Sequence, residues 1–249
     1  QGVSSAASDV YKRQELIVAG DLKAEVVKRG VEFYEMLLEE REDVEGLTGV
    51  TWWRFWNCCL INHYQGELFS EEIYYEVDVE RFATLAGLRI DEAYVKVKEV
   101  AEKIKSTNLT IKLDKITWCT SFIYDFMYID ETKEIKIQWN KKIIPLISGH
   151  MEAGRFAYCD ARLDKLQSSR VYRLADYIHQ HLYLLQRKQE FSLETSKLRE
   201  IAIAVNTYTR YAEFDRNLLK PAVKALAEIC HKQLEYKGSK TKVTFWRKK

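Results

Sequence analysis

The chain has 249 residues, 47% of them apolar and 31% charged, which excludes a disordered chain and allows one or two globular domains. Its most apolar stretch, Trp52–Ile61, is broken by Arg54 and Asn57 and is too short to span a membrane, and its five cysteines lack the CxxC spacing of metal and redox sites, which predicts reduced core thiols. The net charge of +2 divides into −7 for residues 1–150 (19 Lys and Arg against 26 Asp and Glu) and +9 for residues 151–249 (20 against 11), a division that is typical of a protein whose second half meets a polyanion.

The first part of the chain predicts two helices behind a foreign leader. Residues 1–14 are small and polar, with neither the apolar core of a secretory signal nor the Arg-rich pattern of a transit peptide, so we expect a non-native or disordered leader. Residues 15–45 place apolar side chains at helical spacing until glycines interrupt the pattern. Thr51–Tyr64 is a second helix candidate, and its aromatic side indicates a core or a dimer contact rather than a base-stacking platform.

The middle of the chain predicts a short strand, a helix–turn–helix and further strands. Glu72–Val77 is a strand candidate, followed by a helix at Asp78–Ala86 with Asp78 as its N-cap and Gly87 as its stop signal. The later elements are a helix at Asp91–Ile104, a strand at Leu109–Leu113 and a hairpin of Ser121–Tyr128 with Glu134–Trp139.

A less regular stretch at Asn140–Asp160, with one proline and two glycines, marks the expected domain boundary. We therefore expect an N-terminal domain at residues 15–148 and a C-terminal domain at residues 149–249. The second begins with a long helix predicted at Leu163–Leu185, whose apolar residues recur near heptad spacing.

The last sixty residues follow the order of a winged helix. A helix pattern through Leu193, Leu198 and Ile201 precedes a polar turn at Asn206–Thr209. A longer helix is predicted at Glu213–His231, and two strand-like runs at Gln233–Tyr236 and Lys242–Trp246 form a basic hairpin around residues 237–240.

The same order also occurs earlier in the chain, which suggests an internal repeat. Tyr75–Leu113 and Phe191–Tyr236 both run short helix, turn, long helix, strand, and each follows a helix of fitting length. The predicted fold is therefore α+β and helix-rich, with two tandem winged-helix domains carrying small β-hairpin wings. Chance agreement between generic helix–turn–helix patterns is the alternative.

The predicted long helix of the second domain carries side chains suited to DNA. Arg216, Lys220 and Lys224 lie at i, i+4 and i+8, with Asn217 beside them and Arg210 just before the helix. Arg and Asn suit guanine and adenine edges, whereas Lys mostly meets phosphate. The alternative is a solvated basic helix face. Pro221 removes one helical hydrogen bond and predicts a kink or a late start.

The hairpin adds positive charge that would grip phosphate or enter a minor groove, the alternative being a charged tail. Gly238 is expected to permit its tight turn. Its basic residues are Lys237, Lys240, Lys242, Arg247, Lys248 and Lys249.

Other chemistries find little support in the sequence. His179-Gln-His181 is similar to the metal-binding pair of nicking initiators, but in a helix positions i and i+2 point apart. The GxxxxGK[ST] loop of an ATPase is missing. Asp160 and Asp164 are interpreted as a solvated turn or a helix N-terminus. We therefore expect no catalytic residue, no metal and no cofactor.

Several segments resemble the iteron-binding replication initiator (Rep) proteins of bacterial plasmids, over roughly residues 50–249. The segments are LQSSRVYRLADY at 166–177, FSLETSKLREI at 191–201, YAEFDRNLLKPAVKALAEI at 211–229, LEYKGSKTKVTFWRKK at 234–249 and, more loosely, GLRIDEAYVKVKEVAEKI at 87–104.

The resemblance implies a cytoplasmic bacterial protein with two tandem winged helices that binds direct repeats of double-stranded DNA at a plasmid origin. Such proteins help to melt the neighbouring duplex, recruit the host initiator and the replicative helicase, and as dimers paired through the first domain repress their own gene.

Carried over by position, major-groove contacts fall on Arg210, Arg216, Asn217, Lys220 and Lys224, and wing contacts on Lys237, Lys240, Lys242 and Arg247. Auxiliary contacts of the first domain fall on Tyr94, Lys96, Lys98 and Lys103. The rivals are a tandem winged-helix transcription regulator and, less in keeping with the residues, a nicking enzyme.

Overall fold

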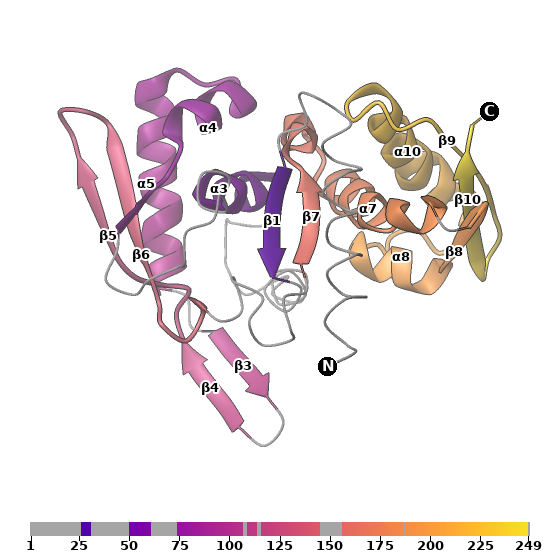
Figure 1. Cartoon of the computed structure of the whole chain (residues 1–249), viewed down its shortest axis with the longest axis horizontal. Helices are drawn as coiled ribbons and strands as arrows, with labels where there is room; N and C mark the ends of the chain where they lie inside the picture. Colours follow the sequence, from indigo (N-terminus) through magenta and orange to yellow (C-terminus); the bar gives the residue numbers. More distant parts are fainter. Residues whose placement is uncertain are drawn as a thin grey trace, which may run out of the picture. The chain divides into compact units, whose positions relative to one another are not determined.

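The structure, a computed structural model, describes residues 26–30, 50–60, 74–106, 109–113, 116–144, 156–186 and 188–248. Contacts between Cα atoms divide the chain into two units (Figure 1). The N-terminal unit is Val27–Tyr158, and the C-terminal unit contains every described residue from Cys159 onward. The leader predicted at residues 1–14 lies outside the described residues.

Within the residues that the structure describes, the N-terminal unit combines three helices with a three-stranded antiparallel sheet in the order β2-β6-β5. Across this sheet Tyr75 pairs with Ile137, and Ile137 pairs with Phe126. A separate two-stranded ribbon, β3-β4, lies between α5 and β5 in the chain. The elements are α3 Val50–Leu60, β2 Tyr74–Glu76, α4 Val79–Ala86, α5 Ile90–Ser106, β3 Leu109–Leu113, β4 Ile116–Thr120, β5 Ile123–Ile129 and β6 Glu134–Trp139.

Local signals fix the helix–turn–helix of this unit where the sequence predicts it. The carboxylate of Asp78 accepts a hydrogen bond of 2.8 Å from the backbone N–H of Arg81, which caps α4. Gly87 ends α4 with φ 67°, a left-handed conformation that favours glycine. These two residues confirm the predicted cap and stop.

Aromatic side chains fill the core of the N-terminal unit. The ring of Trp56 lies 5.3 Å from that of Trp52, 4.8 Å from that of Phe122 and 5.6 Å from that of Trp139, measured between centroids. Trp56 and Trp139 are fully buried. The aromatic side of the predicted helix 51–64 is therefore core, and the helix itself is observed at Val50–Leu60.

The C-terminal unit has a second three-stranded antiparallel sheet in the order β8-β10-β9. Phe245 on its central strand pairs with Phe191 on one side and Tyr236 on the other. Leu174, Leu198, Phe214, Leu226 and Phe245 are buried in its core. The elements are η1 Ala161–Lys165, α7 Ser169–Gln180, η2 Leu182–Gln186, β8 Glu190–Glu194, α8 Thr195–Ile201, α9 Tyr211–Phe214, η3 Asp215–Leu219, α10 Lys220–Glu228, β9 Leu234–Gly238 and β10 Lys242–Arg247.

Both units run helix, strand, helix, helix, hairpin. In both sheets the second strand of the hairpin (β6 or β10) is central, with the first strand of the hairpin (β5 or β9) on one side and the earlier strand (β2 or β8) on the other. This is the winged-helix arrangement, present twice as predicted. One detail of the predicted repeat is wrong: the counterpart of β9 is β5, not Leu109–Leu113. That predicted strand is real, but it belongs to the inserted β3-β4 ribbon.

Periodicity misassigned other segments. Val26–Gly30, within the predicted helix 15–45, is a strand, β1, that pairs with β7 (Phe156–Asp160), a long-range pairing that local spacing does not reveal. The predicted helix Leu163–Leu185 is divided, because Ser168 caps a new helix with its hydroxyl. Leu193 lies in β8 rather than in a helix. The rest of 15–45, residues 61–64 and most of 140–160 lie outside the described residues.

Three of the cysteines, 58, 59 and 230, are buried thiols, and burial raises the pKa of Cys59 and Cys230, whereas Cys119 is exposed. Among the helices that the structure describes, none combines the length and the apolar character of a membrane span.

Candidate nucleic-acid interface

The longest helical run that the structure describes in the C-terminal unit extends from Tyr211 to Glu228 and packs one face into the core. It consists of α9, the five-residue π turn η3 and α10, without a break between them. Phe214, Leu218 and Leu226 are buried along this run. The run is two residues earlier at its start and three residues shorter at its end than the predicted helix Glu213–His231.

The opposite face presents positive charge to solvent. Arg216, Lys220 and Lys224 are exposed on it, Asn217 beside them is half-buried, and exposed Arg210 is the N-cap residue of α9. Lys224 forms an ion pair of 3.6 Å with Glu228. Arg210, Arg216 and Lys220 form no ion pair with any other residue that the structure describes, so their charge is available to an anion.

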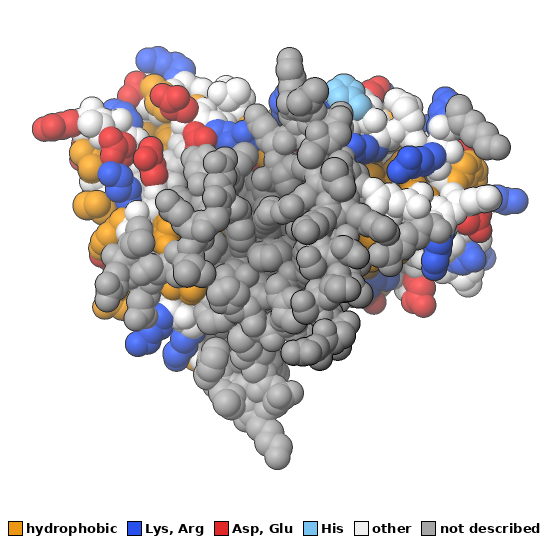
Figure 2. Space-filling model, in the orientation of Figure 1, with side chains coloured by type: hydrophobic (Ala, Val, Ile, Leu, Met, Phe, Trp, Pro, Cys, Tyr) orange, Lys and Arg blue, Asp and Glu red, His pale blue; other side chains and the backbone are white. Residues whose placement is uncertain are grey.

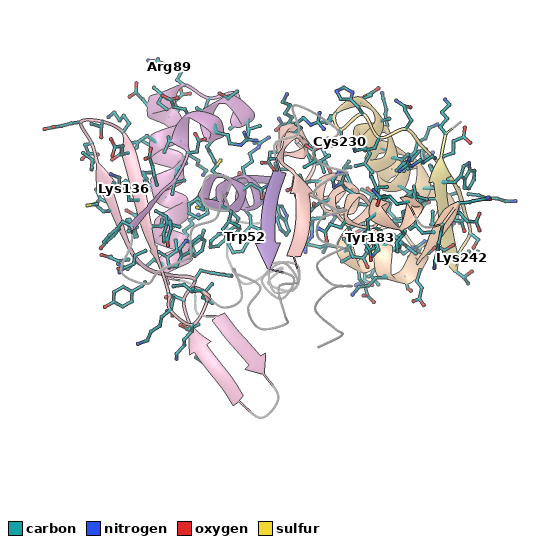
Figure 3. The ribbon with its side chains drawn as sticks, in the orientation of Figure 1. Trp52, Arg89, Lys136, Tyr183, Cys230 and Lys242 are labelled. Carbon is teal, nitrogen blue, oxygen red and sulfur yellow. The ribbon has the colours of Figure 1, made fainter. Side chains whose placement is uncertain are left out.

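The hairpin β9-β10 carries the remaining predicted cations, Lys237, Lys240, Lys242 and Arg247, and all four side chains are exposed. Lys242 lies at the start of β10 (Figure 3). Figure 2 shows several Lys and Arg side chains on the face of the C-terminal unit that it draws. We call residues 234–247 the wing.

Hydrogen bonds hold the tip of the wing to the start of α8. Ser239 closes the turn, because its N–H donates to the carbonyl of Lys242 over 2.9 Å. Thr195, the first residue of α8, is buried; its hydroxyl donates to the carbonyl of Ser239 over 2.9 Å and its N–H donates to that of Thr241 over 3.0 Å. The tip of the wing is therefore held by its backbone, while its lysine side chains are exposed.

Two tyrosines join the wing to the long helix. The hydroxyl of Tyr236 on β9 donates a hydrogen bond of 2.8 Å to Oδ1 of Asp215 at the start of the π turn. The hydroxyl of Tyr211 lies against Gly238, where an added Cβ would be 1.6 Å from that oxygen. Gly238 is thus needed for close approach, and the predicted role in a tight turn is wrong, since it ends β9 without a positive φ.

The electrostatics of this contact keep both phenols protonated. Burial, together with the Asp215 carboxylate, raises the pKa of Tyr211 to about 12. Burial and the hydrogen bond to Asp215 also raise the pKa of Tyr236 well above its ordinary value. Both hydroxyls therefore remain protonated at neutral pH.

The turn before the long helix is also fixed from within the unit. The guanidinium of Arg199 on α8 donates to the carbonyl of Thr209 over 3.2 Å and lies 5.3 Å from the ring centroid of Phe214. Arg199 thus holds the predicted turn at Asn206–Thr209 and does not join the exposed cations.

The auxiliary residues of the N-terminal unit lie on α5 but are engaged within the unit. Tyr94 is buried and donates a hydrogen bond of 2.8 Å to Asp130, and burial and this bond raise its pKa to about 12. Lys96 pairs with Glu99 at 3.1 Å, and Nζ of Lys98 lies 3.5 Å from the ring centroid of Tyr128. Lys103 is exposed and in the last turn.

The histidines and aspartates considered for catalysis have structural contacts within the C-terminal unit. His181 ends α7, with Nδ1 2.8 Å from the carbonyl oxygen of Tyr177. Asp160 caps η1 and Asp164 lies in its first turn, so the predicted helix N-terminus is present, but neither residue is solvated: both are buried, and Asp160 pairs with Arg162 at 2.6 Å. Within the described part of the chain, no group of three His, Cys, Asp or Glu side chains is placed to hold a metal ion.

Sequence reasoning missed the residues that position the cations rather than carry them. These are Thr195, Tyr211, Asp215 and Tyr236, and the hydrogen bonds of Thr195, Asp215 and Tyr236 reach partners 21 to 46 positions away in the chain. The sequence contains one local signal of the π turn: Phe214, Leu218 and Leu226 follow a four-residue apolar spacing, which fits a widened helical turn.

A helix with free cations on one face and a basic hairpin beside its first turns suits a double-stranded nucleic acid. A helix fits the major groove, where Arg and Asn can reach base edges, and lysines on a neighbouring hairpin can meet phosphates. Whether each of these residues contacts DNA stays a prediction.

Comparison with known proteins gives matches for both the sequence and the fold. Residues 54–176 match the family model Rep3_N, described as initiator replication protein, WH1. The solved structure of the Pi initiator protein in complex with iteron DNA is 18% identical, with a TM-score of 0.65 over 90% of this chain and 96% of that one.

A second solved structure is the WH1 domain of MSBI1.176, a replication protein isolated from a multiple sclerosis patient. It is 14% identical, with a TM-score of 0.36 over 45% of this chain and 86% of that one. No curated protein matches the sequence. The likeness to the Pi initiator supports the tandem winged-helix fold over nearly the whole chain.

Proposed function

Because the chain belongs to the family of replication initiator (Rep) proteins, we propose that it binds repeated sequences in a plasmid replication origin and helps to open the neighbouring duplex. The observation that carries this proposal is the exposed row of Arg216, Lys220 and Lys224 on the long helix, next to a basic wing. The fold neighbour that is solved with iteron DNA supports the choice of ligand.

The long helix of the C-terminal unit enters the major groove of one repeat in this proposal. Arg210, Arg216 and Asn217 read base edges, while Lys220 and Lys224 meet phosphates. Lys237, Lys240, Lys242 and Arg247 bring the wing against the backbone beside the groove. Because these contacts neutralise phosphates and release counterions, affinity falls as salt rises.

The N-terminal unit has a different part in the proposal, namely self-association, with auxiliary phosphate contacts from Lys96, Lys98 and Lys103. Its strand β5 lies at one edge of the sheet, and Tyr124 and Met127 on it are 68% and 41% exposed. A long edge strand with exposed apolar residues is a surface for pairing with another chain. A dimer formed in this way would bind an inverted repeat and repress the protein's own gene.

Recruitment of the host initiator and the replicative helicase, in the bacterial cytoplasm, completes the proposed role. These partners follow from family membership, and the chain would act on DNA without a cofactor. The rival function, a tandem winged-helix transcription regulator, would use the same helix and wing, so DNA binding alone does not separate the two.

The test is a mobility-shift measurement with the DNA that flanks the gene, at about 150 mM salt, where electrostatic contacts are screened over about 8 Å. A ladder of discrete complexes on direct repeats of one sequence is the expected result for an initiator. A single complex on an inverted repeat alone would favour the regulator. Equal binding to a scrambled competitor would contradict both.

A further inference from the structure

The long helix of the C-terminal unit contains a π turn with a clear cause in the sequence. The N–H of Lys220 bonds to the carbonyl of Asp215, five residues earlier, instead of four. Pro221 follows directly; it has no N–H, and its ring excludes the carbonyl that an α-helix would place four residues before it. A widened turn before the proline accommodates both restrictions.

This turn changes which residues share a face. Phe214, Leu218, Ala222 and Leu226 are all buried and follow one another at intervals of four. In an uninterrupted α-helix, twelve residues in such steps would rotate the face by about 120°. One additional residue in the turn removes about 100° of this rotation, so all four reach the same core.

The same rotation acts on the cations. Arg216, in the π turn, and Lys224, after it, would differ by about 80° around an uninterrupted helix, and with the π turn they differ by about 20°. Arg216, Lys220 and Lys224 therefore form one row along the exposed face. The π turn thus sets the direction of Arg216 relative to the rest of the row.

One residue links the π turn to the wing. Asp215 supplies the carbonyl that accepts the π hydrogen bond from Lys220, and its carboxylate accepts the hydroxyl of Tyr236 on β9 over 2.8 Å. Four residues earlier, Tyr211 packs its hydroxyl against Gly238 at the end of the same strand. The wing consequently contacts the helix at the turn where Arg216 is set.

Resting on the proposed function, we propose that Asp215 and Tyr236 are positioning residues for sequence recognition. Their hydrogen bond fixes the rotation of the π turn and so directs Arg216 at the base edges. In this arrangement the wing contributes to specificity through the helix, in addition to any phosphate contact of its lysines. Neither Asp215 nor Tyr236 needs to touch DNA.

The first experiment compares Tyr236→Phe with the unaltered full-length protein on two probes. One is the duplex that the unaltered protein enriches from a random-sequence pool, and the other is a scrambled duplex. We expect affinity for the enriched duplex to fall about fivefold to tenfold, the worth of one hydrogen bond. Affinity for the scrambled duplex and the salt slope should not change, because no phosphate contact is lost.

The matched control is Tyr183→Phe, which removes a hydroxyl from η2 rather than from the long helix or the wing (Figure 3). It should leave both affinities unchanged. Asp215→Asn is the conservative variant, since its Oδ1 can still accept the Tyr236 hydroxyl, and it should keep most of the preference for the enriched duplex. Loss of that preference in Asp215→Asn, or in the control, would overturn the assignment.

The decisive measurement is a double-mutant cycle with Arg216→Ala. If Tyr236 acts through Arg216, then Tyr236→Phe has no further effect on specific binding once Arg216 is alanine. Additive losses, or an equal loss on both probes, would show that Tyr236 does not position Arg216. Failure of the proposed function is a separate result: the unaltered protein would then enrich no sequence from the pool.

Discussion

The two winged-helix units have the same topology, but the charged side chains on the last helix before each hairpin are placed differently. On α5 of the N-terminal unit, Lys96 pairs with Glu99, Lys98 lies over the ring of Tyr128, and Lys105 pairs with Asp125 at 2.6 Å. On the long helix of the C-terminal unit, Arg216 and Lys220 have no ion pair with another described residue. The topology presents such a helix twice, but Arg216 and Lys220 are free of the ion pairs that engage Lys96 and Lys105 on α5.

The units also contain two ion pairs of equal length in different surroundings. Lys105 and Asp125 lie 2.6 Å apart with side chains 41% and 40% exposed. Arg162 and Asp160 lie 2.6 Å apart with side chains 14% and 3% exposed. An exposed pair is screened by water, whereas a buried one leaves a desolvated charge behind when its partner is removed.

The largest expected effect comes from breaking the buried pair. Arg162→Met should lower the free energy of unfolding by about 3–5 kcal/mol, because the Asp160 carboxylate stays buried without its partner. Lys105→Met, the matched variant in the other unit, should cost below about 1 kcal/mol. Denaturant unfolding of both variants at pH 7 measures the difference. Equal losses would show that burial does not separate the pairs.

The pH dependence of this difference follows from the pKa of Asp160. Burial alone would raise that pKa, but the hydrogen bond from Arg162 and the charge of His179 outweigh it, so the pKa lies below its ordinary value of 3.8. A lowered pKa contributes stability above 3.8 that is lost as the pH falls through the folded value. The difference in the free energy of unfolding between Arg162→Met and the unaltered protein should therefore narrow as the pH falls below 3.8.

A comparison of two glycines should give the next largest effect. Gly238→Ala puts a Cβ where the Tyr211 hydroxyl lies and should cost about 1–3 kcal/mol of stability through overpacking. Gly87→Ala meets nothing within 4 Å, and its cost of about 1 kcal/mol comes from the positive φ alone.

The two causes separate in a Tyr211→Ala background. There Gly238→Ala should become nearly neutral, because the atom that it would meet is gone, whereas the cost of Gly87→Ala should not change. Thermal unfolding of the three single variants and the two double variants tests this, and additivity of Gly238→Ala with Tyr211→Ala would refute the close-approach explanation.

The sequence predicted those parts of the fold that local chemistry determines. Asp78 and Gly87 mark the ends of α4 by capping and by left-handed backbone, and both signals are read within a few residues. The β5-β6 hairpin and the wing follow from alternating apolar residues around polar turns. The repeat was visible because the order of elements is preserved even where the residues differ.

Long-range pairing and competition between local signals account for the errors. β1 pairs with β7 across more than a hundred residues, so the helical spacing in Val26–Gly30 carried no information about its partner. Ser168 interrupts an apolar pattern that looks continuous. The cations of the candidate interface were visible as a charged row, but Asp215 and Tyr236, which hold it, are joined only in the folded unit.

The next prediction tests whether α5 and the long helix of the C-terminal unit differ in DNA binding. Arg216→Ala should cost about 1–3 kcal/mol of specific affinity if Arg216 reads a base, with little change on scrambled DNA. Lys96→Ala on α5 should have a much smaller effect, because Lys96 is paired with Glu99. Competition binding measures the affinity of each variant for the specific duplex and for the scrambled duplex. An equal loss on all sequences would make Arg216 a phosphate contact only.

The smallest effect is expected from a single wing lysine. Lys240 is exposed in the turn that Thr195 and Ser239 hold in place, so removing its side chain should leave the wing backbone where it is. Lys240→Ala should weaken binding about equally on every sequence and reduce the slope of log affinity against log salt by about one. Lys188→Ala is the control, since exposed Lys188 precedes β8 at the end opposite the tip, where Glu190 pairs with Trp246. If the two variants have the same slope as the unaltered protein, the wing is not part of the interface, and binding must be assigned to the helix alone.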